Sequence, residues 1–286
     1  MKTQPMHSMA TRPPLQQLSR VALVTRDALK GYPEEELKRR FAQRGAEVVS
    51  RAESASLCDV SELPDQGPPP DVVIALGGDG TVLKALVAYP KSPTLAVNFG
   101  RVGFLTQCDR EGLLPSVDRL LNGDYWIEER LALEVRWGER RARCINELVI
   151  KGVAHMCELS LSIDGHEVKR MRGDGLIIGT PTGSTAYLMS TGAPLVTPGV
   201  SCLIANPLNE YSFSSRPIIL PGDAHVEVRV EVCRDQDVVA VIDGGQRHPL
   251  QEGDRFTLRR AEDPTLLVNF DHQSFFKNLR ERMRWG

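Results

Sequence analysis

The pattern of hydrophobic positions changes near Tyr125. Before this residue, short apolar runs alternate with segments whose apolar residues recur at helical spacing. The runs predict strands at 21–24, 47–50, 72–76 and 94–98, and the spaced segments predict helices at 33–45, 81–88 and 111–122. Strands and helices that alternate in this order predict an α/β domain with a parallel, Rossmann-like sheet.

After Tyr125 the chain alternates apolar and polar residues, which is typical of strands with one buried face. Such strands are predicted at 131–137, 142–150, 158–163, 176–179, 201–205, 225–232, 238–243 and 255–259. Asp164-Gly165 is a hairpin turn signal, and only residues 184–190 resemble a helical turn. This half is therefore predicted to be a mostly-β sandwich.

Residues 274–285 form the last amphipathic segment, with Phe275, Phe276, Leu279 and Met283 on one helical face. We expect this terminal helix to return to the first domain. The predicted division is a disordered leader at 1–17, an α/β domain at 18–126, a β-rich domain at 127–266 and the terminal helix at 267–286.

The stretch Gly77-Gly78-Asp79-Gly80 stands between a predicted strand and a predicted helix. Glycines allow positive φ and close approach of a ligand, and the first N–H groups of a helix favour an anion. A carboxylate there repels phosphate, but it can accept a proton from a hydroxyl or hold Mg²⁺. The stretch thus indicates phosphoryl transfer to an alcohol, although a tight turn with an Asx hydrogen bond explains it equally well.

Polar residues gather again in the β-rich half, at Gly173-Asp174-Gly175 and at 180–187. A segment so rich in hydroxyl groups and small residues is a poor core and a good surface for a polar ligand. Asn146-Glu147 interrupts an otherwise apolar strand and could bind a ribose diol or an amide. A polar pair on an edge strand is the alternative explanation.

Composition narrows the class of protein. The net charge of −2 over 286 residues provides no basic surface for nucleic acid. Six scattered cysteines without a C-x-x-C pair argue against a zinc site or a disulfide framework and fit a reducing cytosol. No apolar run approaches the ~18–20 residues of a membrane span, and no signal peptide is evident. We therefore predict a cytoplasmic protein without nucleic-acid or membrane partners.

Taken together, these motifs resemble those of bacterial-type NAD kinases. The resemblance covers nearly all of the chain after Val21. The motifs that carry it are Gly77–Thr81, 97–106, Ile145–Glu147, Val153–Met156, Gly173–Ile178, Thr180–Tyr187, Arg216-Pro217, Val241–Gly244 and the tail from Ser274. The GGDG stretch also occurs in lipid and sugar kinases, whereas 173–187 together with Asn146-Glu147 is much more specific.

The resemblance implies an enzyme that transfers the terminal phosphoryl group of ATP, or of polyphosphate, to the 2′-hydroxyl of the adenosine ribose of NAD. NAD and ATP would be substrates and Mg²⁺ the cofactor, without a dedicated protein metal site. Asp79 would be the general base. Gly80 and Thr81 would help form the phosphate site, Lys84 would point at phosphate, and Phe104 would pack against adenine.

The resemblance also assigns residues of the β-rich half to the dinucleotide. Asn146 and Glu147 would hold a ribose, and Asp174 would bind the nicotinamide end. Thr185, Ala186 and Tyr187 would line the adenine pocket, and the next three residues, Leu188, Met189 and Ser190, would also contact the ligand. His155 matches a position near the ligand, and Arg172 predicts a preference for NAD over NADH. Members of the family commonly assemble, so a homodimer or homotetramer is predicted.

Two departures from the family pattern lie in the β-rich half. Gly192-Ala193-Pro194 stands where a second glycine is usual, and alanine tolerates positive φ poorly. The turn Asp243-Gly244-Gly245-Gln246 places a glycine where glutamine is expected, which leaves the role of Gln246 open.

Two other functions are compatible with parts of the sequence. A lipid or sugar kinase would explain Asp79 but not Asn146-Glu147 or 180–187. A dinucleotide-binding regulator without catalysis would not need Asp79, Lys84 and Arg172. Release of ADP on addition of NAD separates an enzyme from a regulator.

Overall fold

The computed structural model describes residues 10–25, 29, 31–52, 68–100, 103–233, 237–271 and 274–284. Outside these ranges lie Arg101 and Val102 of the motif 97–106 and the first nine residues of the predicted leader. Two compact units make up the described chain. The first runs to Arg130 and resumes at Thr265, and the second spans Leu131–Pro264.

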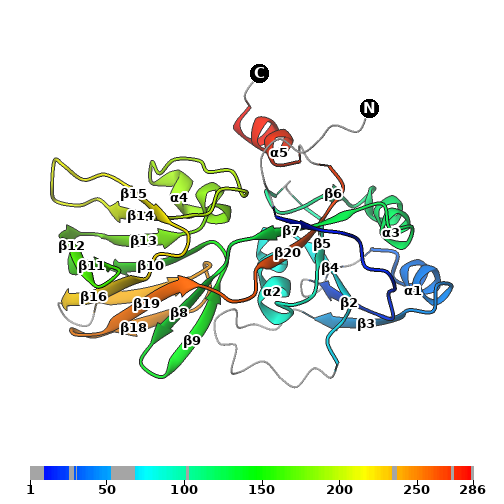
Figure 1. Ribbon diagram of the computed structural model, residues 1–286, viewed down its shortest axis with the longest axis horizontal. Coiled ribbons are helices and arrows are strands. Elements are labelled where there is room, and N and C mark those ends of the chain that lie inside the picture. Colours follow the sequence, from blue (N-terminus) through cyan, green and yellow to red (C-terminus); the bar gives the residue numbers. More distant parts are fainter. Residues whose placement is uncertain are drawn as a thin grey trace. The chain divides into compact units, whose positions relative to one another are not determined.

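The first unit is built on one mixed sheet (Figure 1). Its strands, in spatial order, are β1 (Thr11–Arg12), β7 (Trp126–Arg130), β20 (Thr265–Asn269), β5 (Thr94–Asn98), β4 (Val72–Gly77), β2 (Arg20–Thr25) and β3 (Glu47–Ala52), with β6 (Cys108–Asp109) paired to β5. The core strands β3, β2, β4, β5 and β20 pair in parallel, as predicted for an α/β domain. β7 runs antiparallel to β20 and β1, so the sheet is not wholly parallel.

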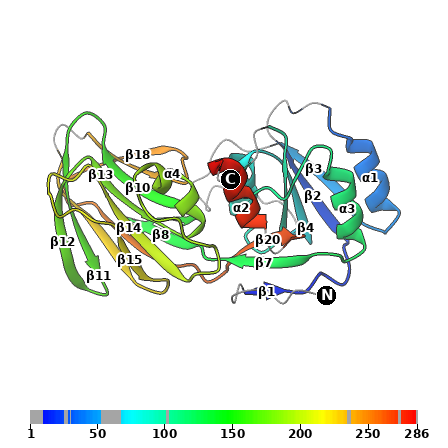
Figure 2. The same ribbon diagram turned by 90° about the horizontal axis from the view of Figure 1, so that it is seen from above.

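Helices cover both faces of this sheet. Figure 2 shows α1 (Glu34–Ala42) and α3 (Leu113–Leu121) on one face and α2 (Asp79–Ala88) on the other. Alternate residues of β4 explain this arrangement: Ile74 packs in one core with Phe41 of α1 and Val117 of α3, while Val73 and Ala75 point to the opposite face. Phe41 is fully buried, and burial of such a side chain stabilises by about 1.5–3 kcal/mol.

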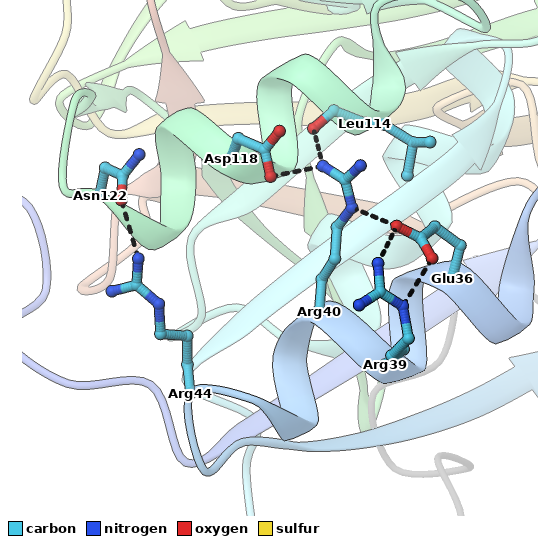
Figure 3. Close-up of polar contacts among 7 residues, drawn as sticks. All are labelled: Glu36, Arg39, Arg40, Arg44, Leu114, Asp118 and Asn122. Carbon is cyan, nitrogen blue, oxygen red and sulfur yellow. Dashed lines mark hydrogen bonds and ion pairs between the residues drawn. The ribbon is translucent and has the colours of Figure 1, made fainter.

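Polar contacts join α1 to α3 (Figure 3). Arg40 of α1 donates from Nη1 to the Asp118 carboxylate and to the carbonyl of Leu114, and from Nε to Glu36 at 2.7 Å. Arg44 donates to Asn122 Oδ1 at 3.0 Å. Because Arg40 is held on both helices at once, its guanidinium links the two elements that cover this face of the sheet.

The described part of the predicted disordered leader has regular contacts. β1 pairs with β7, and the N–H of Leu15 donates to the hydroxyl of Tyr125 at 2.9 Å. The polar composition of the leader did not reveal this pairing, since the partner strand lies more than a hundred residues further along the chain.

The second unit is a β-sandwich, as the alternating pattern predicts. One sheet has the order β15 (Ile218–Pro221), β14 (Cys202–Leu208), β13 (Gly175–Gly179), β10 (Glu147–Gly152), β17 (Val238–Ile242) and β18 (Arg247–Leu250). The other has the order β12 (His166–Gly173), β11 (Cys157–Ile163), β16 (Val226–Val232), β19 (Arg255–Arg260), β8 (Leu133–Trp137) and β9 (Arg140–Cys144). Buried residues of both sheets, such as Leu148, Leu176, Val228 and Phe256, share one core.

The turn at Asp164-Gly165 joins β11 to β12, with φ of 50° and 81°. Positive φ at both central residues is what a two-residue hairpin requires, so this prediction is confirmed. The prediction of one strand over 142–150 is wrong, because β9 ends at Cys144 and β10 begins at Glu147. β10 is also a central strand between β13 and β17, so Asn146-Glu147 is not an edge-strand pair.

The terminal helix α5 (Ser274–Met283) belongs to the first unit, as expected. Phe275 and Leu279 are its buried apolar residues. The strand before it, β20, was not predicted and extends the first unit to include Thr265. Likewise, β7 carries that unit on to Arg130, a little beyond the boundary drawn at 126.

Candidate functional site

Asp79 is the first residue of α2, directly after β4 and the N-cap residue Gly78. The helix therefore begins earlier than the predicted Thr81. Gly78 has φ of −100°, and none of the described glycines of this turn has positive φ. The expectation of left-handed glycines is wrong here. Gly77 is needed for space instead, because a Cβ would lie 2.2 Å from Oγ1 of Thr81.

The carboxylate of Asp79 is held by backbone amides of the loop after β5. Phe104 donates its N–H to Oδ2 at 2.9 Å, and Leu105 donates to Oδ1 at 3.2 Å. Gly103 lies so close that a Cβ there would be 1.9 Å from Oδ1. Because β4 and β5 are parallel neighbours, the loops after both strands meet at one edge of the sheet.

The other predicted residues of this edge lie on α2 and on the same loop. Gly80, Thr81 and Lys84 are in α2, where Thr81 is buried and Lys84 is half-buried. A Cβ at Gly80 would meet no atom within 4 Å. The ring of Phe104 is buried, and the guanidinium of Arg282 in α5 lies 4.7 Å from its centroid.

A second group of predicted residues is organised by Asp243 in the second unit. This buried carboxylate accepts the N–H groups of Ile145 at 2.8 Å, Asn146 at 2.7 Å and Glu147 at 3.1 Å. These bonds hold the chain between β9 and β10, where strand pairing is interrupted. Asp243 has φ of 48° and starts the turn after β17, a conformation that aspartate tolerates.

Glu147 is buried beside Asp243. Burial and the nearby Asp243 carboxylate raise the pKa of Glu147 to about 8, while the N–H of Tyr187 acts in the opposite direction by donating to it. Burial also raises the pKa of Asp243, and its bonds from backbone N–H groups oppose that shift. Asp243 has several donors, whereas Glu147 Oε2 has no hydrogen-bond partner in the described chain. Of the two carboxyl groups, Glu147 is therefore the one that binds a proton more readily.

The hydroxyl-rich segment docks onto the same place. Thr180 donates its Oγ1–H to the carbonyl of Ile145 at 2.6 Å and its N–H to the carbonyl of Asn146 at 2.9 Å. At Gly183 a Cβ would lie 2.2 Å from the oxygen of Asn146. The 3-10 turn η2 (Thr182–Thr185) and α4 (Tyr187–Ser190) follow. The structure thus brings Asn146 and Glu147 together with the predicted segment 185–190.

Within that segment the side chains differ in exposure. Leu188 is fully buried and packs with Val149, Ile177 and Ile204, so it is a core residue. Tyr187 is exposed, and Met189 is half-buried. The expected strain at Ala193 is absent in the described loop, because Gly192 takes the positive φ of 78°.

A cavity of about 760 Å³ lies beside α4 in the second unit. The predicted site residues His155, Asp174, Tyr187 and Ser190 line it, while the predicted Glu147, Arg172 and Thr185 do not. Its other lining residues are Lys151, Gly152, Val153, Ala154, Met156, Thr191, Pro207, Leu208 and Asn209. Asn209 donates to Asp174 Oδ2 at 2.7 Å and was not predicted.

The wall of this cavity at 153–156 is held by Asp237. Its carboxylate accepts the N–H groups of Ala154 at 2.7 Å and His155 at 2.8 Å, and Nδ1 of His155 lies 3.1 Å away. The bond from Ala154, with those from His155, lowers the pKa of Asp237. Arg172 is exposed on β12, and its carbonyl accepts the N–H of Tyr211 at 2.8 Å.

The described residues contain no group of three or more His, Cys, Asp or Glu side chains placed to bind a metal ion. An isolated Asp79 fits a Mg²⁺ ion that is carried mainly by substrate phosphates and water, which is the usual mode for this ion. In the same ranges, no helix is long and apolar enough to cross a membrane.

The chain is similar to known proteins over most of its length. The model of the ATP-NAD kinase N-terminal domain matches residues 16–125, and that of the ATP-NAD kinase C-terminal domain matches residues 145–270. An NAD kinase of Gemmatimonas aurantiaca is 36% identical over 240 residues, which cover 80% of this chain and 83% of that protein. One from Citrifermentans bemidjiense is 34% identical over 267 residues, 88% of this chain and 93% of that protein.

Two solved structures share the fold. An NAD kinase from Archaeoglobus fulgidus in complex with ATP aligns with a TM-score of 0.75 and 27% identity, over 93% of this chain and 98% of that one. The yeast NADH kinase complexed with NADH aligns with a TM-score of 0.78 over 95% of this chain and 89% of that one. At 22% identity, the second likeness concerns the fold alone.

Proposed function

Because the chain belongs to the ATP-NAD kinase family, its reaction is phosphorylation of NAD, and we propose that Asp79 is the general base of a Mg²⁺-dependent transfer from ATP. The observation that carries this proposal is the placement of the Asp79 carboxylate. It stands at the start of α2, where the carboxyl ends of β4 and β5 meet, and two backbone N–H groups fix both its oxygens.

The chemistry follows from this placement. An alcohol keeps its proton at neutral pH, so the proton must leave as the new P–O bond forms. An ionised Asp79 can accept the proton of the 2′-hydroxyl of the adenosine ribose, a contribution typically worth ~10²–10⁴-fold. Gly80, Thr81 and Lys84 would receive phosphate near the N-terminus of α2. Mg²⁺, when bound with the nucleotide, would neutralise charge on the transferred group.

The second unit would hold the dinucleotide. We assign the ribose to Asn146 and Glu147, the adenine to Phe104 and to Thr185, Ala186 and Tyr187 of the segment 185–190, and the nicotinamide end to Asp174 with His155 nearby. What supports this is that Asp243 and Thr180 hold Asn146 and Glu147 beside that segment. Exposed Arg172 would favour NAD over NADH. Arg172→Gly should therefore reduce the ratio of activity with NAD to activity with NADH.

Assembly into a homodimer or homotetramer is also proposed. Tyr211, with 82% of its surface exposed, and Phe213, which is also exposed, lie between β14 and the edge strand β15. Exposed apolar residues beside an unpaired strand edge suit a contact between copies. Light scattering coupled to size exclusion would measure the mass of the assembly.

The proposed reaction is tested by incubating the protein with ATP, Mg²⁺ and NAD and detecting NADP with an NADP-specific dehydrogenase. Asp79→Asn should bind NAD normally and lose at least ~100-fold in kcat, with a slightly lower melting temperature because its amide faces one of the two loop N–H groups. Near-normal turnover by this variant would remove Asp79 from the role of base. If NADP forms with polyphosphate and not with ATP, the phosphoryl donor is polyphosphate.

A further inference from the structure

The helix α5 contacts the loop that holds Asp79 at two points. The guanidinium of Arg282 lies over the ring of Phe104, 4.7 Å from its centroid. Asn278 donates from Nδ2 to the carbonyl of Thr106 at 3.4 Å. Together with the buried Phe275 and Leu279, these residues have the spacing of one helical face. That face of α5 therefore meets the loop 103–106.

The contacted residues are those that fix the carboxylate. Phe104 donates its N–H to Asp79 Oδ2, and Leu105 donates to Oδ1. Thr106 braces the start of the loop, since its Oγ1 accepts the N–H of Gly103 at 3.2 Å. A shift of this loop would move both donors of Asp79 together.

Arg282 is exposed, and its guanidinium makes a cation–π contact with the Phe104 ring. Among the described residues, this ring contact is the interaction that the structure gives Arg282. A guanidinium stacks on an aromatic face as a planar group, which a lysine ammonium does not do. A lysine at this position could therefore keep only part of the contact.

We propose that Arg282 is a positioning residue for the reaction: by stacking on Phe104 it holds the loop 103–106 in the conformation that fixes the Asp79 carboxylate. The proposal rests on the role of Asp79 proposed above. It assigns to the last helix of the chain a task in catalysis without contact to substrate.

The test compares Arg282→Ala and Arg282→Lys with Arg280→Ala, a matched control that removes an exposed arginine from the same helix. Arg282→Ala should lower kcat roughly 2- to 5-fold, the size of a lost cation–π contact at an exposed site, with KM for NAD and ATP unchanged. Arg282→Lys should recover part of the loss, and Arg280→Ala should behave as wild type. A raised KM for ATP with normal kcat would overturn the proposal, because Arg282 would then bind the donor.

A double-mutant cycle with Phe104→Leu tests whether Arg282 affects kcat through the Phe104 ring. If Arg282 acts through the ring, Arg282→Ala should cause little further loss of kcat in the Phe104→Leu background. Full additivity of the two losses would overturn the proposal.

Amide hydrogen exchange tests the role of Arg282 separately from the proposal that Asp79 is the general base. The amides of Phe104 and Leu105 should exchange faster in Arg282→Ala than in Arg280→Ala. Unchanged exchange at these two amides would refute the proposal that Arg282 holds the loop 103–106, whatever the role of Asp79. Faster exchange with normal kcat would refute the link to catalysis. If Asp79→Asn keeps its turnover, the base itself fails, which is a distinct result.

Discussion

Replacement of Asp243 should destabilise the second unit by an amount that depends on how many of its accepted hydrogen bonds survive. Oδ1 accepts from Asn146 and Glu147, and Oδ2 accepts from Ile145. Asp243→Asn can keep Oδ1 and its two donors, but its amide would face the N–H of Ile145. One buried donor is then unpaired, at a cost of about 1–3 kcal/mol.

Removal of the whole carboxylate leaves all three donors without their acceptor. Asp243→Gly is the matched variant for this, because alanine at φ of 48° would add backbone strain of its own. Loss of a buried charge beside Glu147 offsets part of the cost. We therefore expect about 3–5 kcal/mol for Asp243→Gly.

The assay is urea unfolding at pH 7, followed by circular dichroism and tryptophan fluorescence, with amide exchange of 145–147 as the local measurement. Asp254→Ala serves as the control, because this exposed carboxylate accepts one turn N–H, from Gln251, and should cost less than about 1 kcal/mol. Equal losses for Asp243→Asn and Asp243→Gly, or unchanged exchange at 145–147, would refute this account of how the Asn146-Glu147 turn is held.

Three further outcomes are expected. The wild-type protein should lose stability as the pH rises from 4.5 to about 8, because a raised pKa means that Glu147 binds its proton more tightly in the folded than in the unfolded state. Glu147→Gln should abolish this loss. Melting at pH 5 and 8.5 measures the loss, which has an upper limit of about 1.4 kcal/mol per pH unit. Gly103→Ala should lower kcat by at least ~100-fold while the protein stays folded, because its Cβ displaces the Asp79 carboxylate. Arg40→Ala should lower the free energy of unfolding more than Arg39→Ala does, because among the described residues Arg39 bonds to Glu36 of its own helix whereas Arg40 also reaches Asp118 of α3 (Figure 3); equal losses would contradict the role given to Arg40.

The features that sequence could predict are those set by neighbouring residues. The strand, glycine turn and helix around Asp79 are contiguous, and so is the hairpin at Asp164-Gly165. The period of alternation also predicted the sandwich, because it reports burial of one face of each strand. The resemblance of the motifs supplied the family, which the comparisons confirm.

What sequence reasoning missed depends on partners far along the chain. Asp243 looked like part of a turn, but its role is to bind the chain almost a hundred residues earlier, and nothing local to 142–150 signals the interruption there. A buried acid beside a turn glycine was the available signal. β20 escaped because its five residues become a strand only when they insert between β5 and β7.

The glycine turn was located correctly for a partly wrong reason. Gly77 and Gly103 are required by close packing against Thr81 and Asp79 rather than by left-handed backbone. Sequence shows that a side chain is absent, but only the folded chain shows which atom occupies the space.

The insertion of β20 has a consequence for the order in which the protein matures on the ribosome. Residues up to Arg130 are made first, yet their sheet keeps an unsatisfied edge at β5 until residues 265–269 emerge. The whole sandwich must be synthesised in between, at ~5–20 residues per second. Nascent chains therefore carry an incomplete sheet for several seconds, and α5 is made after β20. Chains that stop before residue 265 should keep that edge open, so the finished sheet requires synthesis of the whole sandwich first.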